Sequence, residues 1–179
     1  MLFPGENGKW GAIVRYGEIE RAIASMHGVT VASSGIFRGR LRHFQKLGLV
    51  PSAPGRGAKI DYDRKAAIVW ATAFELSELG IHPDLIAEII QRCGPAIFDF
   101  FEQSTPGDED WFLCFEANYL TAHMNQQPGK RLRLKTALGK PLSGLPVFFE
   151  KSMSRCGSVI NLSRLKRDLG EALDIADWA

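Results

Sequence analysis

The chain has 179 residues, of which 45% are hydrophobic and 23% are charged, and this composition excludes an intrinsically disordered protein. Its length permits one or two domains with sizeable cores. No apolar run approaches the roughly 18 residues of a membrane span, and the N-terminus lacks the basic and apolar regions of a signal peptide. We therefore expect a cytoplasmic protein with no membrane partner.

The formal net charge of +2 conceals three differently charged regions. Residues 1–67 carry 11 Lys and Arg against 5 Asp and Glu, residues 68–116 carry 1 against 10, and residues 117–179 carry 10 against 5. Neutralising phosphates requires cations on the contacting element. A basic front ahead of an acidic middle therefore favours a DNA-binding domain joined to a segment with another role.

The first segment with clear periodicity is residues 17–26, GEIERAIASM. Its apolar residues Ile19, Ala22, Ile23 and Met26 share one face, which predicts an amphipathic helix that supports the element after it. The preceding residues 12–16 fit either a short strand or the run into this helix.

A basic helix follows, with Ser33 or Ser34 as a candidate cap at its start. Helical spacing gives it an apolar face and a face that can reach a ligand: Phe37, Leu41, Phe44 and Gly48 lie on the first, and Ser34, Arg38, Arg42 and Gln45 on the second. Gly48 suits a C-terminal cap, and Pro51 restricts the residue before it. The helix is therefore expected to end near Leu47.

A short basic hairpin is predicted next. Residues 54–57, PGRG, supply turn chemistry, and residues 59–62 alternate polar and apolar as a half-buried strand does. Arg56 and Lys59 are expected at its tip. A basic helix, a sharp stop and a hairpin in this order indicate a recognition helix followed by a wing.

Three stretches in this region resemble the MerR family of bacterial winged helix-turn-helix regulators: LRHFQKLGLVP at 41–51, GAKIDYD at 57–63 and ELSELGI at 75–81. The resemblance covers roughly residues 16–91. It implies that Arg42 and His43 match the family's recognition-helix arginine and first aromatic residue, near phosphate and groove, and that Lys59 lies close to the wing arginine. The chain departs from the family in His43 itself, in a longer spacer before Leu41, and in having no heptad helix after the winged domain. The resemblance therefore implies the DNA-binding domain and not the family's coiled-coil dimer or effector chemistry.

After the wing, Asp63 is a plausible cap for an apolar helix over residues 64–79, and a second helix is expected over residues 84–92. Cys93, Gly94 and Pro95 are expected to interrupt it, with one or two further turns over residues 96–101. An acidic loop at residues 104–110 then marks a domain boundary. We expect a domain over residues 1–103 and a second over residues 111–179.

The second domain shows the period of strands. Strands are predicted at residues 111–120 and at 131–138, where apolar residues alternate with basic ones, and further strands are possible at 147–149 and 158–160. Asn161 is expected to cap a final helix over residues 162–173. The predicted fold class is α+β: an N-terminal winged helix-turn-helix domain followed by a small antiparallel-sheet domain with a C-terminal helix.

Catalytic signatures are absent from the sequence, which has no Walker phosphate loop, dinucleotide fingerprint, HExxH or GxSxG. Its three cysteines, Cys93, Cys114 and Cys156, form no CxxC pair and have no histidine at ligand spacing. The four histidines are scattered, at positions 27, 43, 82 and 123. We expect no enzyme, no cofactor and no metal site, and reduced thiols.

The function favoured by the sequence is a bacterial sequence-specific transcriptional regulator in the nucleoid, bound to double-stranded DNA through a helix in the major groove. The residues predicted to contact DNA are Ser34, Arg38, Arg40, Arg42, His43, Gln45, Lys46, Arg56 and Lys59. Because one module contacts few base pairs, a homodimer through the C-terminal domain is expected.

A second reading is an architectural or excision-type factor of a phage or mobile element, or a protein whose C-terminal sheet binds RNA polymerase or another protein. The basic strand face of Arg131, Arg133 and Lys135 could contact DNA backbone, an acidic partner or only water.

Overall fold

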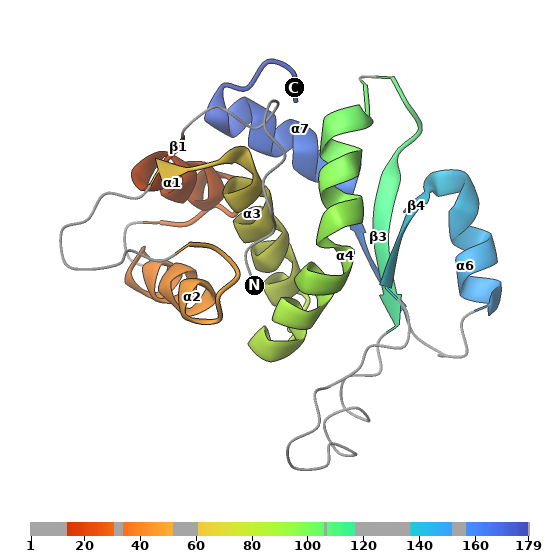
Figure 1. Ribbon diagram of the computed structural model, residues 1–179, viewed down its shortest axis with the longest axis horizontal. Helices are drawn as coiled ribbons and strands as arrows, with labels where there is room; N and C mark the ends of the chain where they lie inside the picture. The colour runs from red at the N-terminus through yellow and green to blue at the C-terminus, as the bar shows by residue number, and fades with distance from the viewer. Residues whose placement is uncertain are drawn as a thin grey trace, which may run out of the picture.

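The computed structural model describes residues 14–30, 34–51, 61–105, 107–116, 137–151 and 157–178. Helices and small antiparallel sheets make up this part of the chain, so the predicted α+β class is confirmed (Figure 1). The elements in chain order are β1 (Val14–Arg15), α1 (Tyr16–Met26), α2 (Ser34–Lys46), β2 (Asp61–Tyr62), α3 (Arg64–Glu78), α4 (Pro83–Gln103), β3 (Trp111–Glu116), β4 (Ala137–Pro141), η2 (Leu142–Gly144), α6 (Leu145–Lys151), β5 (Gly157–Asn161) and α7 (Leu162–Leu173).

The two front helices form where the sequence predicted them. In α1, Ile19, Ala22 and Ile23 are buried and Met26 is half-buried, as the helical spacing required. The start of α1 is stabilised by Glu18, whose carboxylate accepts a hydrogen bond from the backbone N–H of Arg15 at 2.8 Å. α2 ends at Lys46, where Gly48 takes a positive φ of 72° that favours glycine.

A two-residue ladder joins the residues before α1 to the end of the predicted wing strand. β1 pairs antiparallel with β2, with Val14 opposite Tyr62 and Arg15 opposite Asp61. The short strand that residues 12–16 permitted is therefore present at Val14–Arg15. Residues 52–60, with the predicted turn and the first half of the predicted wing strand at 59–62, lie outside the described residues, while the second half is β2. Consequently the winged motif remains a prediction.

α3 is the central element, with α1 and α2 on one side and α4 on the other (Figure 1). Its capping by Asp63 is confirmed, since the carboxylate accepts from the backbone N–H of Ala66 at 2.9 Å. The run from Ala66 to Phe74 is buried at every position, with Trp70 fully buried. A helix that is apolar all round is covered on all sides, and α3 is covered in this way.

The predicted interruption at residues 93–95 is wrong, because α4 is one continuous helix through Pro95. A proline inside a helix removes one backbone hydrogen bond and costs about 3 kcal/mol. Pro95 is exposed, as is Gln91 four residues earlier, so the freed carbonyl of Gln91 can meet water. Burial of Cys93, Ile97 and their neighbours on the inner face, at about 1.5 to 3 kcal/mol for each large side chain, outweighs that cost.

The C-terminal sheet has strand order β4-β3-β5, with both outer strands antiparallel to β3. Leu113 and Phe115 of β3 face the core together with Ile160 of β5, on the side covered by α4 and α7. The predicted strands at residues 111–120 and 158–160 are confirmed over β3 and β5, apart from residues 117–120, which lie outside the described residues. Residues 131–136 also lie outside them, and β4 covers the end of that predicted strand.

The strand predicted at residues 147–149 is wrong, because these residues lie in α6. A run of three apolar residues fits a helix or a strand equally well. The helix is favoured locally by Pro146 in its first turn, where no backbone N–H donor is needed. α6 lies beyond β4, at the far end of the molecule from α1 and α2 (Figure 1).

The final helix, α7, has the predicted bounds, and Asn161 caps it by accepting from the backbone N–H of Arg164 at 2.8 Å. α7 packs against α1 and α3 as well as β3 (Figure 1). Its residues Leu165 and Leu169 belong to the same apolar core as Ile19 and Ile23 of α1. The core is thus continuous across residues 103–111, where the sequence suggested a boundary. Among the described residues, no helix combines the length and apolar character needed to cross a bilayer.

Candidate nucleic-acid interface

The orientation of α2 is fixed by three aromatic and aliphatic side chains on one face. Phe37, Leu41 and Phe44 are buried, as the sequence predicted. The rings of Phe37 and Phe44 lie 4.8 Å and 5.6 Å from that of Phe74 on α3. Burial of three large apolar side chains stabilises one orientation of the helix about its own axis. The opposite face of α2 is consequently turned to solvent.

The solvent-facing surface of α2 is basic and contains no carboxylate. Arg42 and Lys46 follow Gly35 and Gly39 along one stripe at helical spacing, with His43 beside it. All three basic side chains are exposed. The side chains of Arg42, His43 and Lys46 form no hydrogen bond or ion pair with another residue in the described ranges. We call this surface, made of Gly35, Gly39, Arg42, His43 and Lys46, the basic face.

Two further arginines flank the basic face, and each is paired with a neighbouring helix. Arg38 donates from Nε to Oε1 of Glu20 on α1 at 2.6 Å. This hydrogen bond and the carboxylate charge raise the pKa of Arg38 above its usual value, so the guanidinium stays charged. The hydrogen bond to Glu20 uses Nε, which leaves the terminal nitrogens Nη1 and Nη2 available to an outside acceptor. The side chain is still 55% exposed.

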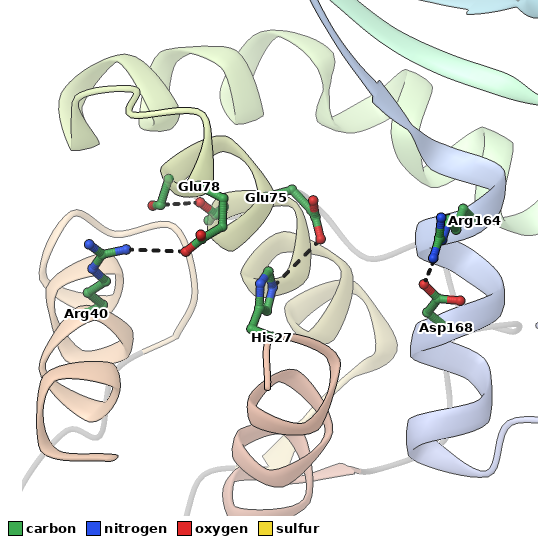
Figure 2. Close-up of polar contacts among 8 residues, drawn as sticks. His27, Arg40, Glu75, Glu78, Arg164 and Asp168 are labelled. Carbon is green, nitrogen blue, oxygen red and sulfur yellow. Dashed lines mark hydrogen bonds and ion pairs between the residues drawn. The ribbon is translucent and has the colours of Figure 1, made fainter. Parts of the chain in front are cut away.

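Arg40 lies on the other flank. Its Nη1 atom is 3.8 Å from Oε1 of Glu78 on α3, and both side chains are more than half exposed (Figure 2). An exposed pair at this separation contributes little to stability, typically about 0 to 1 kcal/mol. Arg40 therefore remains able to exchange Glu78 for another anion.

Gln45 is held within the protein, although the sequence placed it among the residues that reach the ligand. The side chain is half-buried, and its Nε2 atom donates to the hydroxyl of Tyr62 at 2.8 Å. A longer contact of 3.4 Å joins the same atom to the carbonyl oxygen of Pro51. The amide nitrogen that would recognise adenine is thus engaged by the protein itself.

The remaining predicted contact residues are placed only in part. Ser34 is half-buried in the first turn of α2, and Arg56 and Lys59 lie outside the described residues. The structure thus brings together Arg38, Arg42, His43 and Lys46 on or beside one exposed surface, with Arg40 at its edge. Sequence reasoning missed Glu20, Glu78 and Tyr62 as partners of this helix. These partners lie 17 to 38 positions away in the sequence, and a single sequence shows no signal for such pairings.

Other chemistry in the described residues is sparse. No group of three His, Cys, Asp or Glu side chains in the described ranges could hold a metal ion. Cys93 and Cys114 are buried and form no disulfide with a described residue, and burial raises the pKa of Cys93 to about 11, so its thiol stays protonated at neutral pH. Cys156 lies outside the described residues.

A hollow of about 800 Å³ lies between α1 and the residues after α7. Val14, Arg21 and Arg64 line one side of it, and residues 172–177 line the other. An ion pair of 2.8 Å between Arg64 and Asp177 joins the two sides. The hollow therefore lies where the front helices meet the C-terminal end.

No family model matches the chain, and no curated protein matches it closely enough to count as a relative.

Proposed function

We propose that this protein is a sequence-specific regulator that binds double-stranded DNA through α2 and acts as a homodimer. The observation that carries the proposal is the basic face: three exposed cationic or titratable side chains that have no side-chain partner among the described residues, on a helix that contains no carboxylate. An α-helix fits the major groove of B-form DNA, so such a face meets base edges and phosphates together.

The side chains of the basic face suit distinct acceptors on a duplex. Arg42 lies near its centre, and a guanidinium there can donate two parallel hydrogen bonds to O6 and N7 of guanine. Lys46 lies one turn further along, where a flexible ammonium suits a phosphate. Arg38 offers its terminal nitrogens from the flank, since Glu20 holds only Nε.

The surrounding elements support the same proposal. α1 packs on α3 beside α2, and the β1–β2 ladder includes Asp61 and Tyr62 at the end of the predicted wing strand. This order is the one that the resemblance to MerR-like regulators implies. Because a single module contacts few base pairs, we propose a homodimer on a repeated site, with the C-terminal sheet region as the dimerisation or effector part.

Selection of bound duplexes from a random pool, followed by fluorescence anisotropy across a salt series, tests the proposal. We expect an enriched motif and a negative slope of log affinity against log salt concentration. Arg42→Ala should weaken binding to the motif by about 1 to 3 kcal/mol if the guanidinium contacts a base. If it contacts a phosphate instead, the slope should flatten by about 0.9.

Arg167→Ala is the matched control, because Arg167 is also exposed on a helix but lies on α7. It removes the same charge from another surface and should leave affinity almost unchanged. Equal losses in the two variants, or the absence of an enriched motif, would contradict the proposal. Protection of an attachment site instead of a promoter would assign the protein to recombination.

A further inference from the structure

We infer that Ile36 recognises thymine: its side chain packs against the C5-methyl group of a thymine in the major groove and so adds a sequence preference to the basic face. This inference rests on the proposed DNA-binding function and names a feature of the duplex that α2 selects. Ile36 is the third residue of α2 and is not among the side chains described above as donors to DNA.

Ile36 is exposed, unlike the other large apolar residues of its helix. It is 73% exposed, whereas Phe37, Leu41 and Phe44 are buried against the core. The described ranges contain further exposed large apolar residues, all of them outside α2: Leu79, Leu142, Val147 and Val159. A single exposed apolar side chain is ordinary on a protein surface. The position of Ile36 among the cations of the basic face is what indicates a ligand.

The exposure of Ile36 follows from the residues one turn further along α2. Helical side chains lean toward the N-terminus, so residues 39 and 40 are the ones that would cover Ile36. Gly39 has no side chain, and Arg40 extends toward α3, where its Nη1 atom lies 3.8 Å from Oε1 of Glu78 (Figure 2). Ile36 is therefore left uncovered by its own helix.

Ile36 lies on the same exposed surface as the cations. At spacings of three and seven residues it shares one side of α2 with Gly39 and His43, which are both exposed. A duplex that meets the basic face therefore also meets Ile36. The edges of the bases in the major groove present hydrogen-bond donors, hydrogen-bond acceptors and one apolar group, the C5-methyl group of thymine. Because an isoleucine side chain can neither donate nor accept, this methyl group is the complementary contact.

The place of Ile36 along α2 also suits contact with a base. In helix-turn-helix proteins the N-terminal residues of the recognition helix contact base edges, and Ile36 lies in the first turn of α2. Arg42 lies six residues later, which is about 9 Å along the helix axis. That distance exceeds the roughly 3.4 Å between stacked base pairs, so the two side chains contact different base pairs. The preference that Ile36 adds is thus separable from the contact of Arg42.

Replacement of thymine by uracil, which lacks the C5-methyl group and keeps the base pair, tests the inference. Each thymine of the selected duplex is changed in turn to deoxyuridine, and fluorescence anisotropy measures the affinity of the unaltered protein and of Ile36→Ala. We expect one thymine at which the change weakens binding by the unaltered protein about fourfold, which corresponds to burial of one methyl group. The same change should leave the affinity of Ile36→Ala as it was, and the preferences at other positions should persist in that variant.

Leu79→Ala is the matched control, because Leu79 is also an exposed apolar residue but follows α3. It should retain the full loss of affinity on the uracil duplex. Ile36→Ala should unfold at an unchanged or higher urea midpoint, since Ile36 is exposed and alanine favours a helix more than isoleucine does. A weaker affinity of Ile36→Ala for the thymine duplex therefore reports a lost contact and not a loss of folding.

Failure of this inference is distinguishable from failure of the proposed function. If the unaltered protein binds a selected duplex, but every uracil duplex weakens it and Ile36→Ala equally, DNA binding is established and the role of Ile36 is refuted. A selected motif without thymine refutes that role in the same way. If the unaltered protein selects no duplex at all, the proposed function itself fails.

Discussion

The Nε2 atom of His27 lies 3.7 Å from Oε1 of Glu75, joining the C-terminal end of α1 to α3 (Figure 2). The imidazole also contacts the ring of Phe74, with centroids 5.6 Å apart, and its side chain is 12% exposed. Burial is the main cause of the raised pKa of Glu75, and His27 offsets part of that effect. Glu78 and Asp168 raise the same pKa further, while Arg164 lowers it.

The first prediction concerns the pH dependence of stability. Since the pKa of Glu75 in the folded protein lies above its ordinary value of 4.5, the folded state binds this proton more tightly than the unfolded state. The resulting stabilisation is fully present below pH 4.5 and is lost as pH rises through the raised pKa. Glutamine does not titrate, so Glu75→Gln removes this pH-dependent contribution. The free energy of unfolding of the variant, relative to that of the unaltered chain, should therefore increase as pH rises from 4.5 through the raised pKa. Urea unfolding at several pH values measures it, and parallel profiles would contradict it.

The second prediction concerns Gly39 on the basic face. A methyl group added at Gly39 would meet no atom of the described residues within 4 Å beyond its chain neighbours and the backbone of its own helix, and the residue lies inside α2. Glycine in an exposed helix interior is less favourable than alanine by about 1 kcal/mol. Gly39→Ala should therefore raise the free energy of unfolding by about 0.5 to 1 kcal/mol, measured by urea denaturation. Gly48→Ala is the control and should destabilise, because Gly48 has a φ of 72°.

The same Gly39→Ala variant bears on the proposed function. A methyl group in the centre of the basic face would hold the helix away from a duplex. Affinity for the selected DNA should fall although the protein becomes more stable. Anisotropy and thermal unfolding on one preparation would show the two effects together. A variant that is both more stable and equally tight in binding would place the DNA contact elsewhere.

The third prediction concerns the carboxylate that holds Arg38. Glu20→Gln removes a negative charge beside the basic face, so affinity for random duplexes at low salt should rise. The guanidinium also loses its fixed orientation, so the ratio of specific to random affinity should fall. Stability should change little, because the Arg38 side of the pair is exposed to solvent, which weakens the attraction. Glu171→Gln is the control, because it makes the same charge change on α7. Equal effects of the two variants on DNA affinity would contradict the prediction.

The fourth prediction tests the continuity of the core. Leu169 of α7 is fully buried in the apolar core that includes Ile19 and Ile23 of α1. Leu169→Ala should cost about 2 to 5 kcal/mol of stability, while Leu142→Ala, at a side chain 52% exposed, should cost little. Hydrogen exchange at the amides of Ile19 and Ile23 should accelerate in Leu169→Ala. Unchanged exchange there would show that the two halves unfold independently.

The sequence predicted accurate bounds for helices that carry both a periodic apolar face and a residue that marks one end. α2 has a helical apolar stripe and a terminal glycine, and α7 has an asparagine cap followed by leucines at helical spacing. The Asp63 cap was predicted for the same reason, since capping involves residues three apart. One error arose at Pro95, where the residue itself disfavours a helix but packing of the inner face favours one. The other arose at residues 147–149, where three apolar residues are too few to distinguish the period of a helix from that of a strand.

For the candidate site, too, some features could be predicted from local sequence and others could not. Which side chains of α2 face outward follows from the helical period and the three buried apolar residues, so Arg38 and Arg42 were placed correctly on the exposed side. The helical period and the buried residues did not reveal the partners of the α2 side chains. Glu20, Glu78 and Tyr62 reach α2 only because α1, α3 and β2 fold against it.

By itself, the sequence determined the basic helix, its buried stripe and the charge that separates the front of the chain from its middle. These features depend on spacing and composition, which are local. Only the tertiary structure decided that α7 closes the core against α1, and that Gln45 bonds to Tyr62. Contacts between distant segments depend on how several apolar faces pack together, and no single segment specifies that arrangement.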